Sequence, residues 1–156
     1  MSRPKSKRRE GREAAVQFLF QIDLNTERLP GDIETFWKLR NGPGTAPPRP
    51  KARAFAEQLI LGVTTHLTEI DDWIRKFTTN YDVERLAAVD RNVLRMAVFE
   101  MVHCPEVAPV IIIDEAIEVA KKFGSDKSGG FVNGILDRIK EEIGRPARVA
   151  TSSTKS

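Results

Sequence analysis

Residues 111–137 read IIIDEAIEVAKKFGSDKSGGFVNGILD, and this stretch predicts a helix, a turn and a second helix. Apolar side chains recur every three or four residues in its first half, at Ile113, Ala116, Ile117 and Ala120. This spacing places them on one helix face, which we expect to be buried. Gly124 then fits a left-handed cap position, and Ser125 or Asp126 is expected to cap the second helix.

The same apolar spacing predicts further helices outside this stretch, over residues 9–24, 33–39, 55–77, 86–101 and 130–143. No strand-rich segment and no repeat is found in the sequence, so we predict an all-α fold with six to eight helices. Residues 41–50, NGPGTAPPRP, are expected to form a loop because they hold four prolines and two glycines. We expect residues 13–144 to form one helical domain, between a flexible basic arm (1–12) and a disordered tail (145–156).

Positive charge is concentrated at the start of the chain. The net charge is +3 over 156 residues, yet MSRPKSKRREGR, the first twelve residues, holds six basic residues and one acidic residue. The rest of the chain is therefore slightly acidic. A cationic arm on such a body points to an anionic polymer as partner, although a solubilising tail or a targeting sequence would have the same composition.

Several function classes find no support in the sequence. Cys104 is the single cysteine, which rules out an internal disulfide and a cysteine-based zinc site. His66 and His103 lack metal-ligand spacing, and His66 is expected in the core because it lies on an apolar helix face. We expect no metal, no cofactor and no catalytic residue. No apolar run is long enough to span a membrane and no signal peptide is present, so a cytoplasmic protein is expected.

The turn between the two helices of the opening stretch combines aromatic and basic side chains. Phe123 and Lys127 lie at the helix junction, and Phe131 is about one turn into the second helix. Aromatic faces that stack on bases, together with cations along the backbone, are typical of sites for single-stranded nucleic acid. The alternative is that both phenylalanines are ordinary core residues.

Three segments resemble the NusB family of bacterial transcription antitermination factors: KRREGREAAVQFLF, VDRNVLRMAVFEM and IDEAIEVAKKFGSDKSGGFVNGILD. The resemblance covers nearly the whole chain, and its last segment is the most specific. It implies two packed three-helix subdomains, at about residues 13–78 and 79–144.

The resemblance also implies a function, in which the protein binds single-stranded boxA RNA with ribosomal protein NusE. It joins a transcription elongation complex that suppresses premature termination, chiefly on ribosomal RNA operons. The implied contacts with NusE are Glu84 and Asp90. The implied RNA contacts are Lys7, Arg8, Arg9, Arg12, Gln17, Phe123, Lys127 and Phe131.

Two other functions remain open from the sequence. Similar helical domains precede the catalytic domain of some RNA cytosine methyltransferases, but no cofactor-binding α/β segment follows the last predicted helix here. The chain could alternatively be a protein-interaction module, or a homodimer that covers the junction and binds RNA weakly.

Overall fold

The structure is a computed structural model that describes residues 6–24, 33–41, 48–78 and 82–144. These residues form seven α-helices. No strand occurs in these ranges, and the prediction of an all-α fold is confirmed. The helices are α1 (Lys7–Leu24), α2 (Ile33–Asn41), α3 (Pro50–Thr65), α4 (Leu67–Lys76), α5 (Ala88–His103), α6 (Pro109–Phe123) and α7 (Ser128–Ile143), with a 3-10 turn η2 (Val83–Arg85) before α5.

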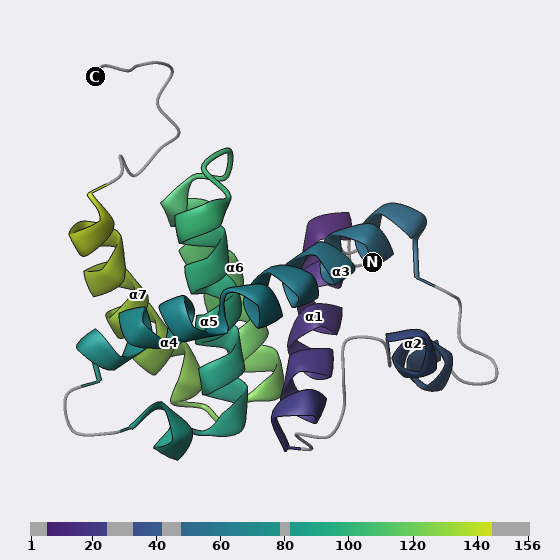
Figure 1. Ribbon diagram of the computed structural model, residues 1–156, viewed down its shortest axis with the longest axis horizontal. Helices are drawn as coiled ribbons and strands as arrows, with labels where there is room; N and C mark the ends of the chain where they lie inside the picture. Colours follow the sequence, from purple (N-terminus) through teal and green to yellow (C-terminus); the bar gives the residue numbers. More distant parts are fainter. Residues whose placement is uncertain (1–5, 25–32, 42–47, 79–81, 145–156) are drawn as a thin grey trace.

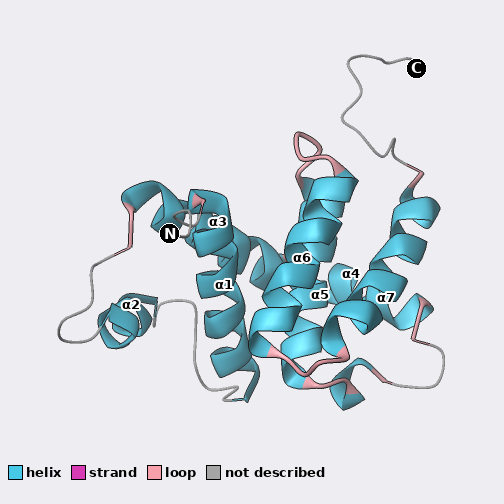
Figure 2. Cartoon of the chain, turned by 180° about the vertical axis from the view of Figure 1, so that it is seen from behind, coloured by secondary structure: helices cyan, strands magenta, loops and turns pink. Residues whose placement is uncertain are grey.

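Helix α1 lies between α3 and the group formed by α5, α6 and α7. It packs against α3 on one side and against α5 on the other, where α5, α6 and α7 contact one another (Figure 1). The view from behind shows α2 beside α1, away from α6 and α7 (Figure 2). The buried apolar side chains of residues before and after residue 78 form one continuous cluster. The expected division into two subdomains at about that residue stays a prediction.

The opening stretch forms α6, a short turn and α7, as predicted. Ile113, Ala116 and Ala120 are buried and Ile117 is partly buried, which confirms the expected apolar face. Helix α7 begins two residues earlier than predicted and ends at Ile143. Gly144 caps it with a φ of 76°, the left-handed conformation that favours glycine.

The second half of the predicted basic arm over residues 1–12 is helical. Lys7 to Arg12 form the first turns of α1. The Ser6 Oγ accepts a hydrogen bond from the Arg9 backbone N–H at 3.0 Å, the geometry of a helix N-cap. The first five residues lie outside the described part, as do the expected tail and most of the loop at 41–50.

The single helix predicted over residues 55–77 is two helices that meet at His66. Its φ of −111° and ψ of 26° depart from helical values, and its side chain is 38% exposed, so the expectation of a core histidine is wrong. The break leaves Leu67 at the surface while Ile70 and Ile74 of α4 are fully buried. Helix α4 thus places its own apolar face in the core.

Candidate nucleic-acid interface

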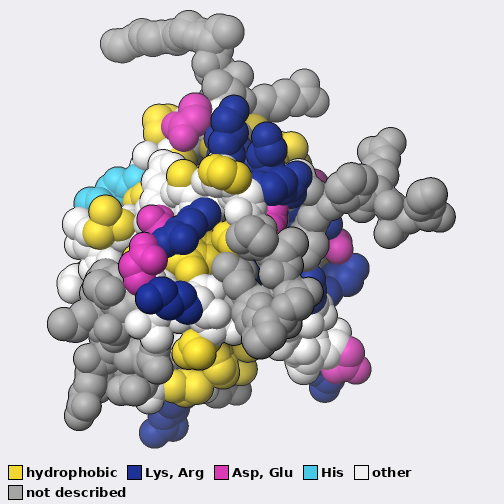
Figure 3. Space-filling view, turned by 90° about the vertical axis from the view of Figure 1, so that its right-hand side faces the viewer, with side chains coloured by type: hydrophobic (Ala, Val, Ile, Leu, Met, Phe, Trp, Pro, Cys, Tyr) yellow, Lys and Arg dark blue, Asp and Glu magenta, His cyan; other side chains and the backbone are white. Residues whose placement is uncertain are grey.

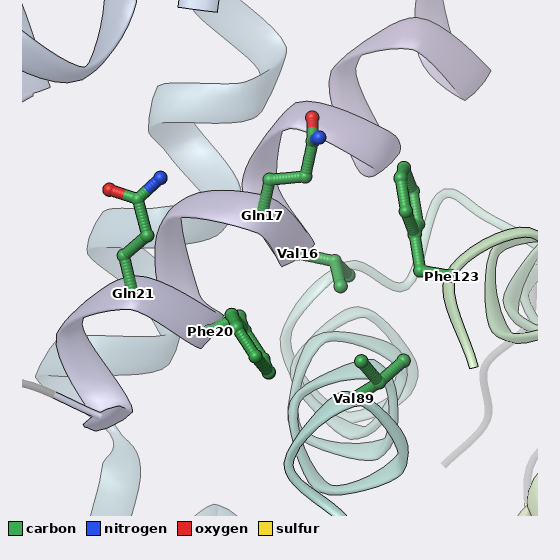
Figure 4. Close-up of a pocket in the computed structure, with 6 residues that line it drawn as sticks. All are labelled: Val16, Gln17, Phe20, Gln21, Val89 and Phe123. Carbon is green, nitrogen blue, oxygen red and sulfur yellow. The ribbon is translucent and has the colours of Figure 1, made fainter. Parts of the chain in front are cut away.

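A pocket of roughly 320 Å³ opens where α1, α5 and α6 meet. Helix α1 contributes most of its lining, and the Phe123 ring stands across from Gln17 at the end of α6 (Figure 4). The floor is apolar and the rim carries two amides, a combination that suits a flat base with polar edges. The lining residues are Val16, Gln17, Phe20, Gln21, Val89 and Phe123.

An ion pair holds Phe123 beside α1. Lys122 Nζ lies 3.0 Å from the Glu13 carboxylate, and it also lies 5.6 Å from the centroid of the Phe123 ring. Gln17 follows Glu13 by one helical turn, so it lies on the same face of α1. The pair therefore brings Phe123 and Gln17 to one pocket although they are distant in the sequence. Both were predicted site residues.

The turn after Phe123 does not have the predicted left-handed cap at Gly124. Gly124 has φ −101° and ψ −157°, which is extended and not left-handed, so the predicted cap is wrong. Glycine is needed here for space, because a Cβ would lie 2.8 Å from the Ala120 carbonyl oxygen and would overlap the Ser128 hydroxyl. The buried Ser128 Oγ in turn accepts a hydrogen bond from the Ser125 N–H at 3.0 Å.

This turn presents Lys127 and Phe131 outside the pocket. Lys127 is exposed and, in place of the predicted Ser125 or Asp126, is the N-cap residue of α7, without a side-chain cap hydrogen bond. Phe131 is 37% exposed and lies one turn into α7, as predicted. An anion approaching here would meet a lysine and the positive end of a helix.

The predicted basic residues differ sharply in their availability. Lys7 and Arg8 are exposed, with the Arg8 guanidinium 4.5 Å from the centre of the Phe55 ring. Both line a shallow groove with Lys51, and Figure 3 shows several lysine and arginine side chains, with acidic ones among them, on one side of the molecule. Long-range attraction of a polyanion needs only this arrangement of exposed charge.

Arg9 is already paired within the protein. Its guanidinium donates two hydrogen bonds of 2.9 Å to the Glu115 carboxylate. The hydrogen bond lowers the pKa of Glu115, against burial, which acts to raise it, and the charges of Arg9 and Arg12 add to the lowering. Arg9 keeps 35% of its side chain exposed, so a phosphate could still reach it.

Arg12 is a structural residue by its surroundings. Its side chain is 2% exposed, and its guanidinium donates to both oxygens of Glu100 at 2.7 and 2.8 Å. This pair uses two of the five guanidinium N–H groups, and the side chain also borders an open groove with Ser6 and Arg8. The pair gives Arg12 a structural role, and its expected role in RNA contact stays a prediction. Sequence reasoning missed the pair because Glu100 lies 88 residues away on α5.

The two acidic residues expected to face a protein partner lie close together in the chain but differ in burial. Glu84, in the η2 turn, is exposed. Asp90 is 9% exposed, in the first turn of α5 next to the pocket-lining Val89. Its Oδ1 is the one buried side-chain oxygen or nitrogen without a hydrogen-bond partner in the described residues.

The sequence also missed part of the pocket. Val16, Phe20 and Val89 line the cavity, and none of the three was among the predicted site residues. The signal was present in the spacing of Val16, Gln17 and Phe20, which puts them on neighbouring turns of α1. What the sequence could not show was which helix would lie opposite.

Neither a metal centre nor a membrane-spanning helix is part of this site. Over the described ranges, no helix is both long and apolar enough to cross a membrane. One group of three histidine, cysteine or acidic side chains is close enough to share a metal ion in these ranges, and it lies elsewhere, at the α3–α4 break.

Comparison with known proteins identifies the class to which this fold and pocket belong. The profile of the NusB family matches residues 9–141. The chain is 47% identical to the transcription antitermination protein NusB of Sorangium cellulosum, over 90% of this chain and 96% of that protein. It is 44% identical to NusB of Geobacillus kaustophilus, over 88% and 98% of the two chains.

Similar solved structures are of the same family as the sequence relatives. A crystal form of T. maritima NusB superposes with a TM-score of 0.75 at 38% identity, covering 91% of this chain and 94% of that one. A structure of the antitermination factors NusB and NusE in complex with dsRNA gives a TM-score of 0.76 at 27% identity, over 87% and 97%. The class is that of all-helical transcription antitermination factors, which are not enzymes. This chain belongs to the NusB family within it.

Proposed function

We propose that this chain binds single-stranded boxA RNA together with ribosomal protein NusE and so helps an elongation complex pass termination signals, chiefly on ribosomal RNA operons. The observation that carries the proposal is the pocket in which Phe123 faces Gln17, between exposed cations on α1 and α7. A base stacked on an aromatic side chain contributes about 1–3 kcal/mol. The setting for this activity would be the bacterial cytoplasm.

The RNA strand would follow the exposed cations, with one base in the pocket. Lys7, Arg8 and Arg9 would contact phosphates near the start of α1, Gln17 and Phe123 would hold a base, and Lys127 and Phe131 would contact the strand beyond it. Arg12 takes a different role in this proposal. Its pair with Glu100 fixes α1 against α5 and so sets the position of the arginines before it.

NusE would bind next to the RNA, at Glu84 and Asp90. The exposed carboxylate of Glu84 supports this, because it is open to a basic group of a partner protein. Val89 lines the RNA pocket one residue before Asp90. One protein partner could therefore cover the edge of the pocket and hold the strand there.

The first prediction compares Arg8→Ala with Arg75→Ala as a matched control. Arg75 is an exposed arginine on α4, paired with Asp72 and remote from the pocket. We expect Arg8→Ala to weaken boxA binding and to reduce the slope of log K against log[salt] by about 0.7, one phosphate contact on a single strand. Arg75→Ala should leave both unchanged. Fluorescence anisotropy at several salt concentrations measures this.

The same titrations with and without NusE separate this function from its alternative. RNA binding that strengthens when NusE is present supports the proposal. No RNA binding by the chain or by its NusE complex, with a dimer in light scattering, would instead favour a protein-interaction module or homodimer.

A further inference from the structure

The α3–α4 break places two histidines and a glutamate together at the surface. His66 forms the break, Glu69 follows in the first turn of α4, and His103 is the last residue of α5. Glu69 Oε1 lies 2.8 Å from His103 Nε2 and 3.7 Å from His66 Nδ1. One ligand atom from each residue lies within 4.8 Å of the other two. From this geometry we infer a binding site for a divalent transition metal, with Zn²⁺ as the expected ion.

The packing of α3 against α5 explains why these residues meet. Gly62 lacks a side chain where the Phe99 ring crosses α3, and a Cβ there would overlap that ring. His66 and His103 each lie four residues after one member of this contact, so the next turn of both helices brings them together. Their rings stack with centroids 4.0 Å apart, and the Phe99 ring lies 5.5 Å from His103.

The donor set has the chemistry of a zinc site with one open position. Two imidazole nitrogens and one carboxylate oxygen are a familiar three-residue ligand set for Zn²⁺, with water as the fourth ligand. Bonds of about 2.0–2.1 Å in a tetrahedron put ligand atoms roughly 3.3 Å apart, a value between the two distances from Glu69. Binding requires the stacked rings to turn so that each nitrogen points at the ion.

Exposure makes this rotation and the entry of an ion feasible. The side chains of His66, Glu69 and His103 are 38%, 46% and 28% exposed, and Figure 3 shows histidine atoms at the molecular surface. The bound ion would link α3 and α4 to the end of α5. Val89 and His103 are about 20 Å apart along α5, so the metal site is separate from the RNA pocket and does not depend on the proposed function.

The test is a Zn²⁺ titration of the full chain without an affinity tag, by calorimetry, with Co²⁺ as a spectroscopic substitute. We expect one ion per chain, a tetrahedral Co²⁺ absorption spectrum and a higher Tm with Zn²⁺. Glu69→Gln and His103→Gln each remove one ligand atom, so each should weaken binding by more than about tenfold. A loss of about tenfold is already typical when a residue that only orients a ligand is removed. Asp72→Asn, which removes an exposed carboxylate three residues from Glu69, is the matched control.

Glu69→Gln is the decisive variant because Glu69 is exposed and its loss should not prevent folding. The inference is overturned if Zn²⁺ does not bind at millimolar concentration, or if Glu69→Gln and Asp72→Asn bind it as the native chain does. RNA affinity measured on the same variants should stay unchanged. A failure of RNA binding in every sample would count against the proposed function and not against the metal site.

Discussion

Arg8 and Arg12 lie one turn apart on α1 and differ in burial and in their contacts. Arg8 is exposed and Arg12 is 2% exposed in its pair with Glu100. The family resemblance implied that both contact RNA. Burial separates them, because a phosphate that displaced Glu100 from this guanidinium would leave a buried carboxylate without its partner.

The second prediction follows from this burial. Arg12→Ala leaves the Glu100 carboxylate uncompensated, so we expect the free energy of unfolding to fall by about 3–5 kcal/mol in urea denaturation. Replacing both residues, as Arg12→Met with Glu100→Leu, should cost much less because no charge is left buried. An Arg12→Ala protein of native stability that has lost only RNA affinity would show that Arg12 is an RNA contact after all.

At the scale of single elements, the sequence predicted which segments are helical but did not predict where the helices end. Apolar spacing located α6 and α7 because one face of each lies in the core. It missed the break at His66, since Phe55 to Phe77 keeps an acceptable helical period across it. It also assigned Gly124 a left-handed conformation, whereas that glycine is required by the approach of Ser128, a contact set by the fold of the turn.

The third prediction contrasts two glycines inside helices. Gly62 of α3 faces the Phe99 ring, whereas a Cβ at Gly134 of α7 would meet no atom within 4 Å. We expect Gly62→Ala to destabilise the protein by about 1–3 kcal/mol through overpacking. Gly134→Ala should stabilise it by up to about 1 kcal/mol through helix propensity. Thermal unfolding of both variants measures this, and equal effects would mean that α3 and α5 do not approach closely at Gly62.

At the scale of the whole molecule, ion pairs connect α1 to helices distant in the sequence. Arg9 binds Glu115 of α6, and Asp23 accepts hydrogen bonds from Arg91 and Asn92 of α5. Burial acts to raise the pKa of Asp23, but these hydrogen bonds and the charge of Arg95 outweigh it and the pKa is lowered. Such partners lie 68 to 106 residues apart, which is why no local pattern revealed them.

The fourth prediction is a loss of stability in acid. Glu115 and Asp23 both have a lowered pKa in the folded protein. Their stabilisation is therefore complete above their ordinary values of 4.5 and 3.8 and is lost as the pH falls through the lower folded values. The urea midpoint should fall in this range, and less steeply in a Glu115→Gln, Asp23→Asn variant. An identical acid slope in that variant would exclude these pairs as the cause.

The central claim is that Phe123 stacks on a base while the cations around it contact phosphates. Its most direct test is the salt dependence of boxA binding for Phe123→Ala beside Lys127→Ala. We predict that Phe123→Ala lowers affinity by about 1–3 kcal/mol with an unchanged salt slope, whereas Lys127→Ala reduces the slope by about 0.7. Native RNA affinity in a folded Phe123→Ala protein would contradict the account, because the pocket would then hold no base.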